Sequence, residues 1–454
     1  MSRVDDRGLL VDDTIVAIAS PPGRGAIAVI RLSGPNAFSI ASKHVRNWQQ
    51  QPRVAHLSAF FDGEERLDEV LITAFPAPHS YTGEDIVEIS THGGYVVPTS
   101  VVATLTTSGA RQATAGEFTR RAVLNGKLDL LQAEAIGDLI DANSRAMQDA
   151  ALAQLDGGLS RRLGALRNEL LDLEALIAYE VDFPEEDDGP IPRDRIERAT
   201  KTVLGALDGL LATVPAGEIV REGAIVVIAG PPNVGKSSLF NALLGKSRAI
   251  VTEIAGTTRD ALEAVIDGGR WPLRLVDTAG LRDTTDRIER LGIEVSERYL
   301  SAAEVVLACA ETLDDLEATV ALVSPRTQAT IIPLLMKADL VSNRNQTPRT
   351  LSVSAESGFG LPRLLSQIES VVDEHCGPRA AGTPLLTAAR HRYALELALS
   401  EISEFHRVWT SGKLPATIAA VHLRTAITAL EELVGAVDVE DILDRVFSSF
   451  CVGK

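Results

Sequence analysis

The 454-residue sequence has little of several features that mark specialised classes of protein. Its three cysteines, Cys309, Cys376 and Cys451, are too few and too scattered for a disulfide framework or a zinc site. Aromatic residues make up 4% of the chain, which argues against the base-stacking sheet of an RNA-recognition motif. We therefore expect a protein of a reducing, cytoplasmic compartment.

Positive charge and long apolar runs are scarce as well. The chain has 44 Lys and Arg against 62 Asp and Glu, a net charge of −18, which excludes a globally basic nucleic-acid surface but not a local basic patch. No apolar run reaches the ~18 residues of a membrane span, and the acidic N-terminus lacks the apolar stretch of a signal peptide. We expect no membrane association, and the length predicts roughly three domains.

Up to about residue 125 the pattern predicts a compact α+β domain. Residues 14–32 contain two β-rich runs around a Pro-Pro-Gly turn. Short apolar runs at 70–75 and 86–90 and a helical pattern at 96–108 complete this part.

The rest of the chain alternates between helical and α/β character. Residues 128–215 have apolar side chains at helical spacing, interrupted by the acidic stretch 183–194, which we interpret as a solvated loop rather than an acidic metal site. Between 223 and 375 short apolar strands alternate with helices, which predicts a parallel sheet. The chain is helical again from Pro384 to Phe450, so we expect the α/β part to be an insertion in a helical domain.

A phosphate-binding loop is the most specific local signal. GPPNVGKSS at 230–238 fits the pattern G-x-x-x-x-G-K-[ST] and lies between a predicted strand and a predicted helix, the context that supports the motif. Gly230 and Gly235 let the backbone N–H groups approach the phosphates closely. Lys236 is expected to neutralise phosphate charge, and the Ser237 hydroxyl to ligate magnesium.

Two further elements are expected around the γ-phosphate. DTAG at 277–280 ends a predicted strand, where the aspartate reaches magnesium through water and the Gly280 N–H faces the γ-phosphate. GTTRD at 256–260 lies between this motif and the phosphate loop and offers Thr258 as a second magnesium ligand.

The guanine base has its own pair of predicted elements. KAD at 337–339 offers the Asp339 carboxylate to N1–H and N2–H of guanine, and SAESG at 354–358 is positioned to stabilise the base through its backbone. Five elements in this order predict a guanine nucleotide hydrolase. The nucleotide-binding set from these elements and from the loop before GTTRD is Asn233, Val234, Gly235, Lys236, Ser237, Ser238, Thr252, Glu253, Ile254, Ala255, Gly256, Thr257, Thr258, Asp277, Thr278, Ala279, Gly280, Lys337, Asp339, Ser354 and Ala355.

The catalytic solution differs from that of Ras. Leu281 follows DTAG and cannot orient an attacking water as glutamine does. Glu289 is a nearby carboxylate that could orient water through a second water, with an exposed helical glutamate as the alternative. Asn233 and backbone carbonyls before GTTRD could hold a monovalent cation, which would supply the positive charge of an arginine finger. Glu289 and Lys236 are thus the predicted catalytic residues.

The motifs also support a resemblance that covers essentially the whole chain. GPPNVGKSSLFNAL, GTTRD and DTAGLR resemble the TrmE–Era group of translation-linked GTPases. DTIVAIASPPGRGAIAVIRLSG, YTGEDIVEISTHGG, GEFTRRAVLNGKLDLLQAEAIGDLI and FSSFCVGK resemble the MnmE family of tRNA-modification GTPases. The resemblance implies an α+β N-terminal tetrahydrofolate-binding and dimerisation domain at 1–125, a helical domain at 126–220 and 380–454, and an inserted α/β P-loop GTPase domain at 221–379.

The resemblance further implies an activity. A homodimer, joined to the FAD/NADH enzyme MnmG in a heterotetramer or larger complex, would add a carboxymethylaminomethyl or aminomethyl group to C5 of the tRNA wobble uridine. The one-carbon unit would come from 5-formyltetrahydrofolate or another tetrahydrofolate, and GTP hydrolysis would require Mg²⁺ and be stimulated by K⁺.

The site residues of the family carry over by matching motifs. Folate contacts fall on Arg31, Glu88, Lys127 and Lys454, although the first and third could be ordinary surface charges and Glu88 the polar member of an alternating strand. Potassium ligands fall on Asn233 and on backbone groups of Thr252, Ile254 and Thr257. The magnesium ligands would be Ser237 and Thr258, and Glu289 would position water.

Two residues have uncertain roles. Met336 stands where the family's NKxD motif has asparagine, and it can neither hydrogen-bond the base nor brace the phosphate loop. Losing such a hydrogen bond costs about 0.5–1.5 kcal/mol, so we expect weaker GTP binding with guanine preference kept by Asp339. Cys451 is either a nucleophile or a side chain that packs against the folate site.

Two alternative functions remain open from the sequence. One is an Era-class GTPase that binds RNA in ribosome assembly without modifying it; a basic RNA module beside the GTPase domain would favour it, and none is visible. The other is a folate-binding scaffold whose shape GTP controls. For tRNA, local patches must do the binding, and the candidates are Arg161, Arg162, Arg167, Arg390 and Arg392.

Overall fold

The computed structural model describes residues 13–182, 193–246, 262–267, 269–277, 298–340, 350–376, 384–411, 416–435, 450 and 453. The chain divides into two compact units, each considered by itself below. One unit combines Met1–Gly137 with Glu431–Lys454, and the other is Asp138–Leu430. Helix α4, Leu130–Asp141, runs from the first unit into the second.

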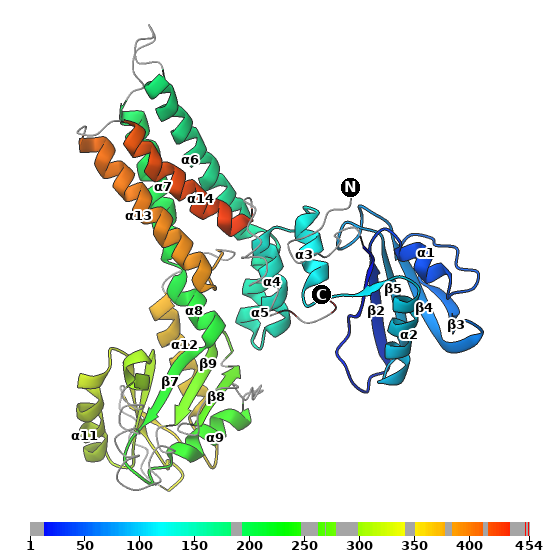
Figure 1. Ribbon diagram of the computed structural model, residues 1–454. Helices are drawn as coiled ribbons and strands as arrows, with labels where there is room; N and C mark the ends of the chain where they lie inside the picture. The colour runs from blue at the N-terminus through cyan, green and yellow to red at the C-terminus, as the bar shows by residue number, and fades with distance from the viewer. Residues whose placement is uncertain are drawn as a thin grey trace, which may run out of the picture. The chain divides into compact units, whose positions relative to one another are not determined.

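The first unit is built on a six-stranded sheet (Figure 1). Its strand order is β3-β4-β5-β2-β1-β6, with every pairing antiparallel except β1 with β6. The strands are β1 Ile15–Ile18, β2 Ile27–Ser33, β3 His56–Asp62, β4 Glu65–Phe75, β5 Ile86–His92 and β6 Arg111–Gln112. The helices are α1 Ala37–Ser42, α2 Val96–Thr107 and α3 Glu117–Leu124. Strand β3 and helix α3 are elements that the sequence pattern did not predict.

The two faces of this sheet are covered differently because side chains alternate along each strand. Ile30 and Leu32 of β2 face the main core, together with Ile40 of α1 and Leu105 of α2. The opposite face carries a smaller cluster around Phe118 of α3, with Ile15, Ala17 and Ala113 buried and Tyr81 partly buried against them. Charged residues, including Arg31 and Glu88, lie on this second face.

The second unit contains helices that precede and follow the α/β part (Figure 1). They are α5 Arg145–Leu155, α6 Gly158–Asp182, α7 Arg193–Leu211, α8 Val214–Glu222, α13 Ala389–Ser411 and α14 Ala416–Val434. Helix α7 packs against α6 and α13, and Arg424 of α14 pairs with Glu174 of α6 at 3.1 Å. The helical stretches on either side of the α/β part therefore pack together, as the sequence predicted.

The inserted α/β part has a six-stranded sheet of order β12-β11-β10-β7-β9-β8. All its pairings are parallel except that of β8 with β9. Its elements are β7 Ala224–Ala229, α9 Lys236–Lys246, β8 Leu262–Asp267, β9 Pro272–Asp277, β10 Val305–Ala310, α11 Leu313–Val323, η2 Ser324–Arg326, β11 Thr330–Leu335, β12 Leu351–Ser352 and α12 Leu361–Cys376. The all-buried β10, VVLACA, is typical of a central parallel strand. The antiparallel β8 was not predicted, but the multidomain fold class is confirmed.

One helical stretch needs comment because of its composition. Asp194–Glu222 is the single stretch among the described residues that is long and apolar enough to cross a membrane, with a mean hydropathy of 1.5. Half of that window is buried inside the protein. Helices in the core of a soluble protein have the same properties, so this observation is weak support for a membrane span.

Candidate functional site

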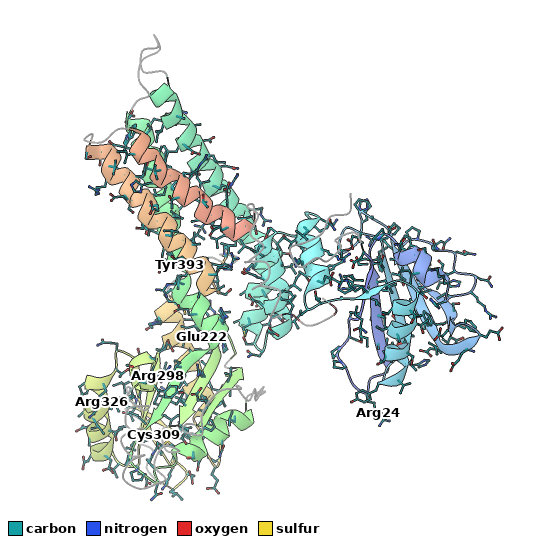
Figure 2. All side chains as sticks on the ribbon, in the orientation of Figure 1. Arg24, Glu222, Arg298, Cys309, Arg326 and Tyr393 are labelled. Carbon is teal, nitrogen blue, oxygen red and sulfur yellow. The ribbon has the colours of Figure 1, made fainter. Side chains whose placement is uncertain are left out.

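The phosphate loop lies between β7 and α9 and depends on an unusual backbone. Gly230 has φ 156° and Gly235 has φ 99°, and Asn233 has φ 62°. A Cβ on Gly230 would lie 2.3 Å from the carbonyl oxygen of Cys309, on the neighbouring strand β10 (labelled in Figure 2). Only glycine fits between the loop and this strand, which fixes where the loop starts.

Lys236 and Ser237 begin helix α9 and turn toward the loop and the end of β9. The Lys236 ammonium donates to the carbonyl oxygens of Gly230 at 3.0 Å and Pro231 at 2.8 Å, and the residue is buried. The Ser237 hydroxyl donates to Asp277 Oδ2 at 2.7 Å. Asp277 is fully buried at the end of β9. The structure thus brings together the predicted lysine, the predicted magnesium-ligating serine and the predicted aspartate.

Cys309 lies close to this loop, but its side chain is buried in the core of the sheet. Burial raises the pKa of its thiol to about 12, and the residue is completely buried in β10. The thiol is therefore protonated at neutral pH, and its role is to pack in the core beside Gly230.

Met336 lies on the side of the site predicted for the base. It is buried in the core of the α/β sheet, in the same apolar cluster as Val234 of the phosphate loop. The thioether offers apolar packing there. The weaker GTP binding expected from the missing asparagine stays a prediction.

Asp339 and Ser354 are held next to each other. The Ser354 hydroxyl hydrogen-bonds the Asp339 carboxylate, and this bond lowers the pKa of that carboxyl below its ordinary value. Asp339 is exposed and Ser354 is buried. Lys337, with φ 54°, pairs with Glu311 at 2.5 Å. An ionised, exposed carboxylate at this place can accept hydrogen bonds from a bound base.

A second site lies in the first unit. A pocket of about 330 Å³ opens on the α3 face of the sheet. Its lining residues come from β4, β5, the segment between them, the stretch before β3 and the turn after α3: Arg53, Phe75, His79, Ser80, Tyr81, Ile86, Glu88 and Lys127. The volume falls within the range of small-molecule sites.

Glu88 and Arg31 pair across the sheet next to this pocket. They are register partners on β5 and β2, and the Arg31 Nη2 donates to Glu88 Oε1 at 2.7 Å. The guanidinium also lies over the rings of Tyr81, at 5.4 Å, and Phe118, at 5.8 Å. Lys127 lines the same pocket and donates to the Pro78 carbonyl at 3.0 Å. Three of the predicted folate residues are therefore neighbours.

The sequence missed four residues of this pocket that offer polar groups: Arg53, His79, Ser80 and Tyr81. The Arg53 Nη2 donates to the His79 carbonyl at 2.6 Å, so the two residues are linked. In the sequence, the YTGED motif, which precedes Glu88 and begins with Tyr81, was the one feature that could have indicated these pocket residues. The others lie in turns that have no periodicity.

Some predicted site residues lie outside the described residues. These are Thr252, Glu253, Ile254, Ala255, Gly256, Thr257, Thr258, Thr278, Ala279, Gly280, Glu289, Cys451 and Lys454. Near the C-terminus, Gly453 is described, and a Cβ on it would lie 2.3 Å from the Ile18 carbonyl of β1.

The basic residues predicted for tRNA lie on two helices of the second unit. Arg161, Arg162 and Arg167 are on α6, and Arg390 and Arg392 are on α13. Arg392 pairs with Glu396 at 2.8 Å and with Glu218 at 3.1 Å. Its charge is thus partly compensated within the chain.

Two family models together match most of the chain. The profile of the TrmE N-terminus, a GTP-binding protein, matches residues 14–127, and that of the MnmE helical domain matches residues 130–451. Among solved structures, the G domain of the T. maritima FeoB iron transporter is 21% identical, covers 33% of this chain and 99% of its own, and has a TM-score of 0.27.

Three relatives that match nearly the whole chain share the same description. A tRNA modification GTPase MnmE from Moorella thermoacetica is 42% identical over 98% of this chain and 100% of its own length. The proteins of that description from Heliobacterium modesticaldum and Aquifex aeolicus are 41% and 37% identical over 98% and 97% of this chain, and both are covered over 100% of their own length. This chain, a GTP hydrolase with the phosphate loop described above, belongs to the MnmE family of tRNA modification GTPases.

Proposed function

We propose that this chain uses GTP hydrolysis to drive the addition of a carboxymethylaminomethyl or aminomethyl group to C5 of the tRNA wobble uridine, together with an FAD/NADH enzyme of the MnmG type. The observation that supports this best is that one chain has both a phosphate loop and a separate charged pocket. A GTPase of the Era class, which modifies no RNA, has no need of the second site. Family membership favours the same choice.

A tetrahydrofolate is the proposed ligand of the pocket in the first unit. A carboxylate such as Glu88 accepts hydrogen bonds from the N–H groups along a pterin edge, and cationic groups such as Arg53 and Lys127 attract an anionic glutamyl tail. Tyr81 and Phe75 offer apolar surface to the ring system. Lys454 would join this set.

The nucleotide site fits Mg²⁺ and K⁺ by the chemistry of its oxygen donors. Ser237 lies beside the fully buried Asp277 carboxylate, so these two residues, with Thr258, would hold magnesium directly or through water. Asn233 would contribute an amide oxygen to a monovalent cation, with backbone groups of Thr252, Ile254 and Thr257. The cations would neutralise the charge that develops on the phosphates. Lys236, which donates to two loop carbonyls, would hold the loop around the phosphates, and Glu289 would orient the attacking water.

Exposed apolar residues on the α3 face of the first sheet support the proposed homodimer. Ile27, Leu57 and Leu71 are 63%, 62% and 44% exposed, and Leu57 and Leu71 are register partners on β3 and β4. Exposed apolar groups gathered on one sheet face are typical of a protein interface. Light scattering of the full chain measures the oligomeric state.

Nucleoside mass spectrometry of tRNA from cells lacking this chain tests the proposed function. We expect the 5-substituted wobble uridine to be lost and to return when the intact chain is restored. The Lys236→Ala variant should fail to restore it, because modification would depend on GTP hydrolysis. Unchanged tRNA in the deletion strain would contradict the proposal, and ribosome profiles would then test the Era-class alternative.

Met336→Asn is expected to tighten GTP binding by a factor of about 2–12. Asparagine at this position can hydrogen-bond the loop or the base, which is worth about 0.5–1.5 kcal/mol. The gain is reduced by the apolar packing that the core of the sheet loses with the Met336 side chain. Titration with fluorescent GTP measures it, with Met336→Leu as the control that keeps an apolar side chain. Equal binding of GTP and ATP by the unsubstituted chain would show that Asp339 does not confer guanine preference.

A further inference from the structure

The segment between β4 and β5, residues 76–85, forms part of the pocket wall without regular structure of its own. His79, Ser80 and Tyr81 of this segment line the pocket. Its internal hydrogen bonds are local turn contacts, such as that of the Ser80 hydroxyl to the Glu84 carbonyl at 2.5 Å, and they form no ladder with a strand. A wall without a hydrogen-bond ladder must be placed by contacts from elsewhere.

Arg53 and Ser33 supply two of those contacts, to His79 and Thr82, and helix α3 with the turn that follows it supplies others. Thr119 and Tyr81 share a hydroxyl hydrogen bond at 2.8 Å, and Asn125 donates to the Thr82 carbonyl at 2.7 Å. Between these two, the Arg121 Nη1 donates to both oxygens of the Glu84 carboxylate, at 3.2 and 3.3 Å.

Glu84 connects this contact to the sheet. Its Oε2 accepts from the Ser33 hydroxyl at 2.7 Å, and Ser33 lies on β2, two residues after Arg31. A single carboxylate therefore joins α3, the wall segment and the strand that carries Arg31. The charged group that faces it is Arg121.

Arg121 is 4% exposed and is surrounded by carboxylates. Besides Glu84 it pairs with Asp13 at 2.5 Å and with Glu117 at 3.0 Å. Arg111 pairs with the same two, Asp13 and Glu117, each at 2.6 Å, and also donates to the Gln112 carbonyl, so its hydrogen bonds lie away from residues 76–85. Two arginines thus share one buried cluster, and Arg121 is the one bonded to the pocket wall.

We infer that Arg121 is a positioning residue for the ligand pocket of the first unit. It does not line the pocket, but it holds the 76–85 segment in place through Glu84, so that Tyr81, His79 and Ser80 face the ligand. The inference deepens the proposed function and rests on it for the identity of the ligand, a tetrahydrofolate. The positioning itself is a property of the chain alone.

The test compares Arg121→Gln with Arg111→Gln in the full-length chain. Both variants remove a guanidinium from the same cluster, and both are expected to lower Tm. Hydrogen exchange without ligand should speed up in residues 76–85 for Arg121→Gln only. Calorimetric titration with 5-formyltetrahydrofolate should give a Kd at least about tenfold higher for Arg121→Gln, because the wall segment loses both charged hydrogen bonds from Arg121 to Glu84, each worth at least about that factor. The Kd of Arg111→Gln should stay within about twofold of that of the unsubstituted chain.

Glu84→Gln is the second variant, and it serves if Arg121→Gln does not fold. It keeps the side-chain shape and is expected to show the same faster exchange in residues 76–85 and the same higher Kd for 5-formyltetrahydrofolate. The Arg121→Gln/Glu84→Gln double variant should have a Kd no higher than that of either single variant, because both substitutions remove the same interaction. Equal loss of affinity in Arg111→Gln and Arg121→Gln, or unchanged exchange in residues 76–85, would overturn the inference. If the unsubstituted chain does not bind 5-formyltetrahydrofolate, the proposed ligand is wrong, while the exchange measurement still decides whether Arg121 holds the segment.

Discussion

Lys236→Ala is expected to lower the rate of GTP hydrolysis at least about 100-fold. The ammonium is buried at the start of α9 and donates to two carbonyl oxygens of the phosphate loop, Gly230 and Pro231, so its charge is held where the phosphates bind. Removing one preorganised cationic donor from such a site typically costs about 10²–10³ in rate. Single-turnover phosphate release, with GTP above the Kd of each variant, measures it.

The matched control for this prediction is Lys201→Ala, which removes the same charge from an exposed position on α7. It should hydrolyse GTP at the unsubstituted rate. Hydrolysis by Lys236→Ala within tenfold of that rate would mean that the loop lysine does not stabilise the reaction. The same assay in potassium chloride and in sodium chloride tests the proposed cation site, because a site built on Asn233 should give faster hydrolysis with potassium.

Glu88→Gln is expected to weaken 5-formyltetrahydrofolate binding by a factor of about 10–150. The substitution keeps the shape of the side chain but removes the charge that faces the pocket and pairs with Arg31 at 2.7 Å. Hydrogen bonds to a charged group are worth about 1.5–3 kcal/mol, which converts to this range. Calorimetric titration of the full chain measures the change in Kd.

Glu65→Gln is the control for Glu88→Gln. It removes the same charge from an exposed position at the start of β4, outside the residues that line the pocket. Its Kd should equal that of the unsubstituted chain. If Glu88→Gln binds the folate as tightly as this control, the Glu88 charge does not contribute to folate binding.

The parts of the fold that depend on local pattern were predictable. The buried run of β7, the glycines at 230 and 235 and the start of α9 follow from short segments whose physical requirements are local. The two strands around the Pro-Pro-Gly turn followed from the alternation of apolar residues. By contrast, β3 was not predicted, because HLSAFFD has no clean alternation of apolar and polar residues. Strand β8, Leu262–Asp267, was not predicted either.

The phosphate loop, the order of the nucleotide motifs and the family of this protein follow from the amino-acid sequence alone, because each is carried by residues close together in the chain. The pairing of Arg31 with Glu88 across β2 and β5, and that of Arg121 with Glu84, emerged only in the folded chain. These partners lie 57 and 37 residues apart. Contacts over such separations arise from strand register and helix packing, which no local spacing encodes.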